Sequence, residues 1–315
     1  MVSTLLEQLH ARKQGLRFYG ITPPKRGQDA AQLHAIAERQ VQRIAGLQPD
    51  GLILYDLQDE AGRTGRERPF PFLPTLEPTE YARDFLASLP IPRVLYKCVQ
   101  NQDRQQFLAW LDTFEGANAR DACVLVGAPS SAAGGRTAAP GLTLPQAYDL
   151  LRQRARPVTV GGVAIAERHA RRYDEDERLL AKYASGCRFF ISQTVYDPAA
   201  TKSLLSDYAL RFGREGLPLV PFVLSFSPCG SLKTMEFMKW LGISFPRWLE
   251  NELRYSPRIL EKSVELAKSV FADVQAFARE KAIPIGINVE SVSIRKEEID
   301  ASCELFGALS RALTA

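Results

Sequence analysis

The sequence predicts a (β/α)8 barrel, in which eight parallel strands alternate with helices around a closed core. Three observations favour it: eight short apolar segments rich in β-branched residues, helical spacing between them, and polar residues gathered where those segments end. A chain of 315 residues suits one such barrel or two ordinary domains. We expect a single barrel domain over 1–315 with a long helical insertion at about 232–281. A doubly wound sheet with extra helices is the alternative.

The expected strands mostly lack period-two alternation, as parallel strands covered on both faces do. In chain order they are Leu16–Ile21, Gly51–Asp56, Arg93–Cys98, Ala122–Ala128, Val158–Ala164, Arg188–Gln193, Leu219–Phe226 and Ile283–Glu290.

The segments between the strands carry apolar residues at helical spacing, and a further helical segment follows the eighth strand. They are AAQLHAIAERQVQRIAG, EYARDFLASL, RQQFLAWLDTF, LPQAYDLLRQR, EDERLLAKYASG, ATKSLLSDYALRF, the long segment from LKTMEFMKWLG to AFAREK, and EEIDASCELFGALSRAL. Residues 129–141, PSSAAGGRTAAPG, follow the fourth strand, so we expect a loop of the catalytic face there.

Composition excludes several classes of function. The 40 basic and 36 acidic residues are spread along the chain, which predicts no nucleic-acid or membrane surface and leaves acidic small molecules as possible ligands. The five Cys show no CxxC or Cys/His clustering, so we expect no disulfide framework and no metal site. The N-terminus lacks the apolar centre of a signal peptide, and we expect a cytoplasmic location.

The C-terminal ends of barrel strands face the active site, so polar residues there are the candidates. Asp56 is the first candidate for a catalytic acid, and Asp59, Glu60 and Glu290 are the next, because all of them end or follow strands. The alternative for the acidic residues after strand two is a solvated loop in which Asp and Arg side chains pair. Gln58 and Asp59 lie in the same stretch and are candidate substrate contacts.

Two further candidates follow strands five and six. His169 follows strand five and could donate a hydrogen bond to a ligand, or be an ordinary loop residue. Gln193 ends strand six and presents a donor beside an acceptor, which suits a flat heterocycle such as a pterin, flavin or purine. Its alternative is a hydrogen bond to the backbone of a neighbouring loop. No phosphate-binding glycine pattern and no GxSxG element is present.

The stretch GGVAIAERHARRYDEDERLLAKYASGCRFFISQTVYD resembles the methylenetetrahydrofolate reductase family. That family has an E-x-H element after strand five, a K-x-x-x-G helix end, and a T-Q or S-Q pair followed by an Asp. The corresponding residues here are Glu167 and His169, Lys182 to Gly186, Ser192-Gln193 and Asp197. Supporting similarities are the Pro-Pro-Lys after strand one, LVPFVL at strand seven, and FPRWL.

The resemblance implies a barrel enzyme that passes a hydride from NAD(P)H, usually through FAD, to 5,10-methylenetetrahydrofolate, giving 5-methyltetrahydrofolate. It implies that His169 and Lys182, with Glu167 and Glu175, contact the flavin. It also implies that Gln193 binds the folate through hydrogen bonds. A cation and an imidazole suit a pyrophosphate, and a side-chain amide suits a pterin. Assembly into a homo-oligomer is left open by the sequence.

The chain departs from the family at several positions. The family's catalytic Glu, three residues before the Pro-Pro pair, is Gly20 here, and the Asp after strand four is Ala128. Ile165 replaces a Tyr, and Glu175 and Arg178 keep the contacts of helix five only in part. Three hypotheses follow: a reductase using FAD, a flavin-free reductase of the same substrate, and a folate-binding or methyl-transfer-associated protein without reductase activity.

Overall fold

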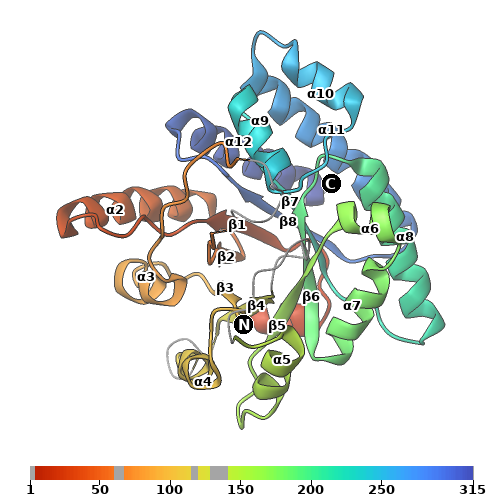
Figure 1. Cartoon of the computed structure of the whole chain (residues 1–315). Helices are drawn as coiled ribbons and strands as arrows, with labels where there is room; N and C mark the ends of the chain where they lie inside the picture. Colours follow the sequence, from red (N-terminus) through yellow and green to blue (C-terminus); the bar gives the residue numbers. More distant parts are fainter. Residues whose placement is uncertain (1–3, 60–66, 115–119, 128–140, 315) are drawn as a thin grey trace.

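A computed structural model gives the structure of the protein and describes residues 4–59, 67–114, 120–127 and 141–314. Eight strands pair in the order β1 to β8 and close into a barrel, with β1 paired to both β2 and β8 (Figure 1). All these pairs are parallel. The predicted (β/α)8 barrel is therefore confirmed.

Six of the strands are shorter than expected at one end, β3 has the expected bounds, and β6 is one residue longer at each end. They are β1 (Arg17–Ile21), β2 (Gly51–Leu54), β3 (Arg93–Cys98), β4 (Ala122–Val126), β5 (Val160–Ala164), β6 (Cys187–Thr194), β7 (Phe222–Phe226) and β8 (Ile285–Glu290). The helices are α1 (Leu5–His10), α2 (Ala30–Leu47), α3 (Pro78–Phe85), α4 (Arg104–Asp112), α5 (Leu144–Arg152), α6 (Ala166–Arg172), α7 (Glu175–Ala184), α8 (Pro198–Arg214), α9 (Leu232–Trp240), α10 (Arg247–Arg254), α11 (Ile259–Glu280) and α12 (Lys296–Thr314).

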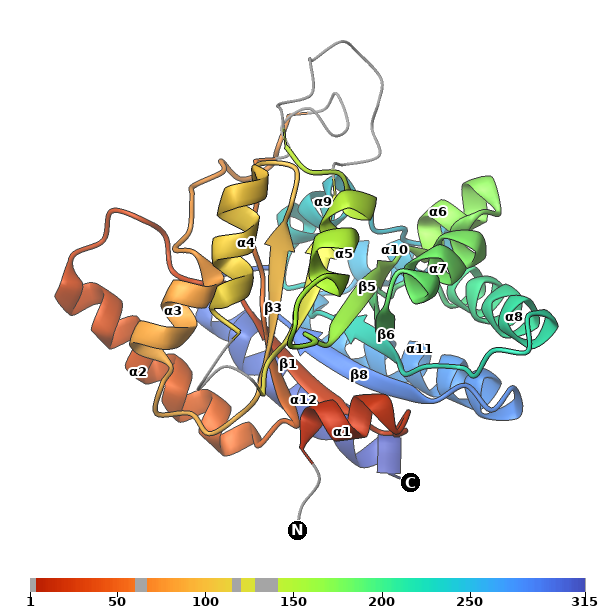
Figure 2. The same cartoon turned by 90° about the horizontal axis from the view of Figure 1, so that it is seen from below.

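Apolar side chains form two layers on opposite faces of the strands. The inner layer fills the barrel and includes Phe18, Ile53, Phe189 and Val223. The larger outer layer lies between the strands and the surrounding helices. Leu5 of α1 belongs to the inner layer, and Figure 2 shows α1 below the barrel, at the end away from α6 and α9. This helix closes the N-terminal end of the barrel, so the mouth at the C-terminal ends of the strands is the end left for a ligand.

Two helical regions differ from the sequence-based expectation. The stretch after β5, expected as a loop, forms the short helix α6, which leads into α7. The region between β7 and β8, expected as one long helical segment, is divided into α9, α10 and α11. The divisions fall at Gly242, which has a φ of 89°, and near Pro246 and Pro257, because proline cannot continue a preceding helix.

No helix among the described residues is long and apolar enough to cross a membrane. The low-complexity stretch after β4 lies outside the described residues except for Gly141, and Ala128 and Glu60 also fall outside them.

Candidate ligand site at the barrel mouth

A carboxyl group from β8 takes the space beside Gly20 at the barrel mouth. Gly20 and Glu290 are register partners in the β1–β8 pair. A Cβ atom added at Gly20 would lie 3.1 Å from Oε2 of Glu290 and 2.9 Å from Cε2 of Tyr55. A carboxyl group on the adjacent strand thus lies beside the position where the resemblance places an acid, and only glycine fits there without movement of these side chains.

Glu290 is enclosed by polar groups from several strands. Desolvation raises its pKa, and hydrogen bonds with Tyr55, Thr194 and Asn288 oppose the increase. Oγ1 of Thr194 donates to Oε1 of Glu290 at 3.3 Å. Nδ2 of Asn288 donates to the hydroxyl of Tyr55 at 2.9 Å and to Oγ of Ser225 at 3.2 Å. The raised pKa favours the protonated form of this carboxyl group, which can donate a proton or a hydrogen bond.

An irregularity in β6 lets two successive side chains point to different partners. The β6–β7 register shifts between Ile191 and Thr194. Thr194 turns to Glu290, while Nε2 of Gln193 donates to the carbonyl oxygen of Leu241 at 2.8 Å. Gln193 thus makes a hydrogen bond to the backbone of a neighbouring loop, which was the alternative prediction for this residue. Its Oε1 is buried and has no hydrogen-bond partner within the described part of the chain.

Asp56 connects the ends of two neighbouring strands. Its Oδ2 accepts from the backbone N–H of Cys98 at 2.8 Å, and its Oδ1 accepts from Nε2 of Gln58 at 2.7 Å. Oε1 of Gln58 accepts in turn from Asn101 at 2.8 Å. Desolvation raises the pKa of Asp56, and the bond from Cys98 opposes this. Both oxygens of Asp56 have donors within the chain, whereas Asp59 is exposed on the same loop.

Glu167 and Asp197 hold the turn that follows α9. Oε1 of Glu167 accepts from the backbone N–H of Ser244 at 3.2 Å, and Oδ2 of Asp197 accepts from the Ser244 hydroxyl at 3.4 Å. Desolvation raises the pKa of Glu167 to about 7, with the charge of Asp197 adding to the increase. Three residues from distant parts of the sequence therefore bind the turn Leu241–Ser244, namely Glu167, Gln193 and Asp197.

His169 lies among helices on the outside of the barrel. It is 0% exposed, its Nε2 lies 2.9 Å from Oδ2 of Asp207 on α8, and its Nδ1 lies 3.9 Å from Oδ1 of Asp176. These contacts join α6, α7 and α8.

Lys182 and Glu175 form an ion cluster behind β5. Nζ of Lys182 donates to the carbonyl oxygen of Val163 and lies 3.8 Å from Oε1 of Glu175. Oε2 of Glu175 lies 3.1 Å from Nε of Arg168, and its Oε1 accepts from the N–H of Ile165 at 3.2 Å. Desolvation lowers the pKa of Lys182 and raises that of Glu175, while the pair's mutual attraction opposes both shifts.

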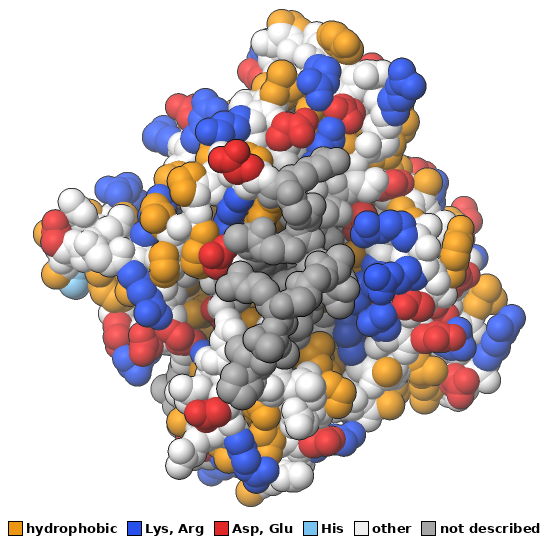
Figure 3. All heavy atoms as spheres, viewed as in Figure 1, with side chains coloured by type: hydrophobic (Ala, Val, Ile, Leu, Met, Phe, Trp, Pro, Cys, Tyr) orange, Lys and Arg blue, Asp and Glu red, His pale blue; other side chains and the backbone are white. Residues whose placement is uncertain are grey.

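These contacts do not fit a flavin held by the expected residues. A pyrophosphate needs accessible cations or N–H donors, but His169 is fully buried and Lys182 is bonded to the chain's own backbone and carboxylate. Figure 3 shows Lys and Arg side chains gathered beside the mouth over α6 and α7, where Arg171 and Arg172 are exposed. Those two arginines are not among the residues that the resemblance assigns to the flavin.

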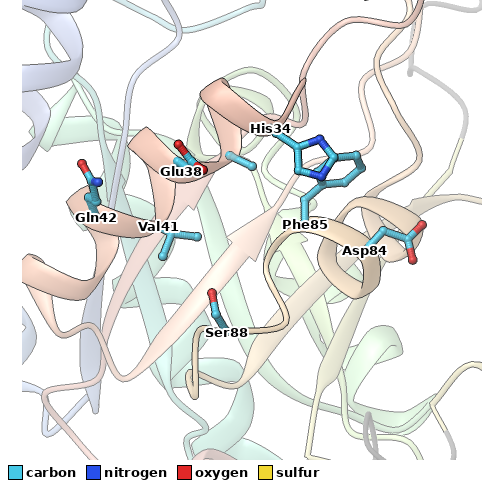
Figure 4. A pocket seen from close by; sticks show the side chains of 8 residues that line it. His34, Glu38, Val41, Gln42, Asp84, Phe85 and Ser88 are labelled. Carbon is cyan, nitrogen blue, oxygen red and sulfur yellow. The ribbon is translucent and has the colours of Figure 1, made fainter. Parts of the chain in front are cut away.

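A separate hollow between α2 and α3 has a volume of about 230 Å³ and is shown in Figure 4. His34 lies edge-on to Phe85, with ring centroids 5.3 Å apart, and Glu38 and Asp84 are exposed beside them. The hollow lies on the helical layer and not at strand ends, so it is not the candidate site. The described residues contain no group of three or more His, Cys, Asp or Glu side chains placed to hold a metal ion.

No model of a known protein family matches the chain, and no curated protein does. Among solved structures, an uncharacterized protein from Clostridium thermocellum that binds two copies of 5-methyl-5,6,7,8-tetrahydrofolic acid is 40% identical, with a TM-score of 0.84. The match covers 98% of this chain and 99% of that chain. The chain belongs to the same family as that protein.

Other solved structures share much less with this chain. Xanthomonas albilineans dihydropteroate synthase with 4-aminobenzoic acid is 13% identical over 97% of this chain and 94% of that one, with a TM-score of 0.44. A 2,3-dimethylmalate lyase of the PEP mutase/isocitrate lyase superfamily is 10% identical over 91% and 80%, with a TM-score of 0.48.

Thr194 and Ser244 were not predicted, whereas Tyr55 and Asn288 belong to the polar residues expected at the strand ends. Tyr55, Asn288 and Thr194 surround Glu290, and Ser244 binds Glu167 and Asp197. Tyr55 follows the buried Ile53 by two residues, so strand periodicity could have placed both inside the barrel. No local pattern indicates Ser244, because its partners come from distant segments.

Proposed function

We propose that the protein binds a reduced folate of the 5-methyltetrahydrofolate type at the barrel mouth. The observation that carries the proposal is the match of 40% identity over 98% of the chain to a protein that binds this compound. A pterin ring carries adjacent N–H groups that can donate to a carboxyl or amide oxygen. Glu290 and the unpaired Oε1 of Gln193 supply such oxygens at the strand ends.

Calorimetric titration with 5-methyltetrahydrofolate tests this proposal. Glu290→Ala should weaken binding by about 10- to 100-fold, because a buried polar group of the ligand that loses its hydrogen-bond partner costs roughly 1–3 kcal/mol. Glu304→Ala is the matched control, since Glu304 is an exposed carboxylate on α12. Absence of binding by the wild-type protein at millimolar ligand would refute the proposal, and equal affinity in Glu290→Ala would remove Glu290 from the site.

A flavin-free reductase of the methylenetetrahydrofolate reductase type is the second candidate, and the pairing of Gly20 with Glu290 favours it. Glu290 would donate a proton to the folate nitrogen whose bond to the methylene carbon breaks. NAD(P)H would deliver a hydride to that carbon, which stays bonded to the other nitrogen and gives the 5-methyl product. FAD is not part of this candidate, because the residues expected to hold it are bonded within the chain.

Oxidation of NADH or NADPH that depends on 5,10-methylenetetrahydrofolate is the measurement for this candidate. Glu290→Gln should lower turnover by about 100-fold or more, the range of a lost general acid, while leaving folate binding measurable. Folate binding without any turnover would leave the protein as a folate-binding or methyl-transfer-associated protein.

A further inference from the structure

Arg171 lies on α6 and bends back toward the barrel mouth. Its Nε donates to the backbone carbonyl oxygen of Glu167 at 3.0 Å, one helical turn closer to the C-terminal end of β5. Desolvation raises the pKa of Glu167, and the charge of Arg171 opposes the increase, so the guanidinium lies near this carboxyl group. Glu167 in turn binds Ser244 in the turn after α9. The guanidinium of Arg171 is therefore placed beside this turn at the mouth.

Most N–H donors of this guanidinium have no partner within the described part of the chain. An arginine has five N–H donors in a planar fork, and Arg171 uses the one on Nε. Arg171 and Arg172 are both exposed, and Arg172 makes no hydrogen bond or ion pair with a described residue. The other arginines of α6 and α7 already have carboxylate partners, which are Glu175 for Arg168 and Asp174 for Arg178.

The nearby carboxyl groups leave Arg171 available for an anion. Glu167 binds the N–H of Ser244, and burial raises its pKa to about 7, so it carries only part of a charge near neutral pH. Asp197 caps α8 by accepting from the N–H of Ala200 at 3.0 Å, and it also accepts from the hydroxyl of Ser244 at 3.4 Å. Both groups are thus used to hold the chain, and the terminal nitrogens of Arg171 face solvent.

Arg171 and Glu290 lie on opposite sides of the mouth. In the closed ring of eight strands, β5 is opposite β1. Glu290 lies beside Gly20 of β1, whereas α6 begins directly after β5. A folate has its pterin ring at one end and a glutamate with two carboxylates at the other, with a p-aminobenzoyl group between them. A folate whose pterin binds beside Glu290 can therefore lie across the mouth with its acidic end toward α6.

We propose that Arg171 binds a carboxylate of the glutamate tail of a reduced folate, with Arg172 adding positive charge to the same part of the mouth. The inference rests on the proposed function and specifies how the second end of its ligand is held. An arginine fits a carboxylate because two parallel N–H groups can donate to its two oxygens. The protein should therefore select a folate with a charged tail over one whose tail is neutral.

Two probes test this contact, namely 5-methyltetrahydrofolate and its diamide, in which both carboxylates are replaced by neutral amides. In calorimetric titrations the wild-type protein should bind the acid at least about tenfold more tightly than the diamide, because the charge-assisted pair is lost. In Arg171→Gln this ratio should fall to about threefold or less, while the affinity for the diamide stays within about twofold of wild type. Arg171→Lys keeps the charge without the planar fork and should give an intermediate ratio.

Arg279→Gln is the matched control, since Arg279 is exposed in the last turn of α11, just before β8 begins at the other end of the barrel. It should keep the wild-type ratio. Equal binding of the two probes by the wild type, or an unchanged ratio in Arg171→Gln, would overturn the inference and leave the proposed function standing. An equal loss of affinity for both probes in Arg171→Gln would also overturn it, because Arg171 would then act only through α6. Failure of the wild type to bind either probe at millimolar concentration would refute the proposed function itself.

Discussion

The two sides of the barrel mouth use their polar residues in different ways. On the side of β8, β1 and β2, Glu290 stands at the strand ends beside Gly20 and Tyr55, with a raised pKa. On the side of β5 and β6, the family-like residues Glu167, Lys182 and Gln193 bind other parts of the same chain. Residues that resemble a family's ligand-binding set in order and type can therefore bind other parts of their own chain.

The largest effect is expected from a variant that places an acid on β1. Gly20→Glu would push a side chain into Tyr55 and Glu290 and place a second carboxyl beside the first. We expect a loss of about 3 kcal/mol or more in the free energy of unfolding, since overpacking and an unpaired buried charge add together. Urea unfolding measures this loss.

The double variant Gly20→Glu with Glu290→Gly moves the carboxyl from β8 to β1 and serves as the matched test. It should recover at least half of the lost stability and some 5-methyltetrahydrofolate binding. Equal destabilisation in the single and double variants would show that the two positions do not share one space.

On the opposite side, Lys182→Met removes the cation from the cluster with Glu175 and the Val163 carbonyl. We expect a loss of about 3 kcal/mol in stability, because breaking a buried ion pair leaves its partner without full compensation. The affinity for 5-methyltetrahydrofolate should stay within about twofold of wild type. A stable variant with strongly weakened ligand binding would contradict the structural role assigned to Lys182.

The pH dependence of stability should reveal Glu167. Its pKa rises from 4.5 to about 7 on folding, so the folded state holds a proton that the unfolded state releases. The stabilisation is complete below about pH 4.5 and is lost as pH rises through about 7, with a total of about 3 kcal/mol.

Glu167→Gln should flatten this part of the profile, as measured by urea unfolding between pH 5 and 8 on both proteins. Asp197 and Arg171, the charged groups that also act on Glu167, are unchanged in the variant. An identical slope in the two proteins would assign the titration to another group.

The smallest expected effect is that of added FAD. A ligand raises the melting temperature only if it binds the folded state, so FAD at tens of micromolar should leave it unchanged, whereas 5-methyltetrahydrofolate should raise it by a few degrees. A visible absorbance band of bound flavin, or a clear shift with FAD, would revive the flavin-dependent hypothesis and require Lys182 or His169 to change partners.

Sequence patterns predicted the barrel because each strand and helix carries its own periodicity. They also singled out Glu290, which ends a strand, and Gln193, including its alternative contact with a loop backbone. They could not predict that this backbone is Leu241, because 48 residues separate the pair and only the folded barrel brings them together. They also placed His169 in a loop, although AERHARR forms α6 and carries it into a helical interface.

The pairing of β1 with β8 has a consequence for folding kinetics. Phe18 lies beside Asn288 in the ring, so the first strand gains its second neighbour only when the last strand is in place. Bringing such distant segments together costs chain entropy before any contact compensates for it, and a high contact order slows folding. A circular permutant that joins the ends and opens the chain in an exposed loop between other strands would make this pairing local, but it would make the pair beside the new opening the distant one. Its folding rate should therefore stay close to that of the natural chain.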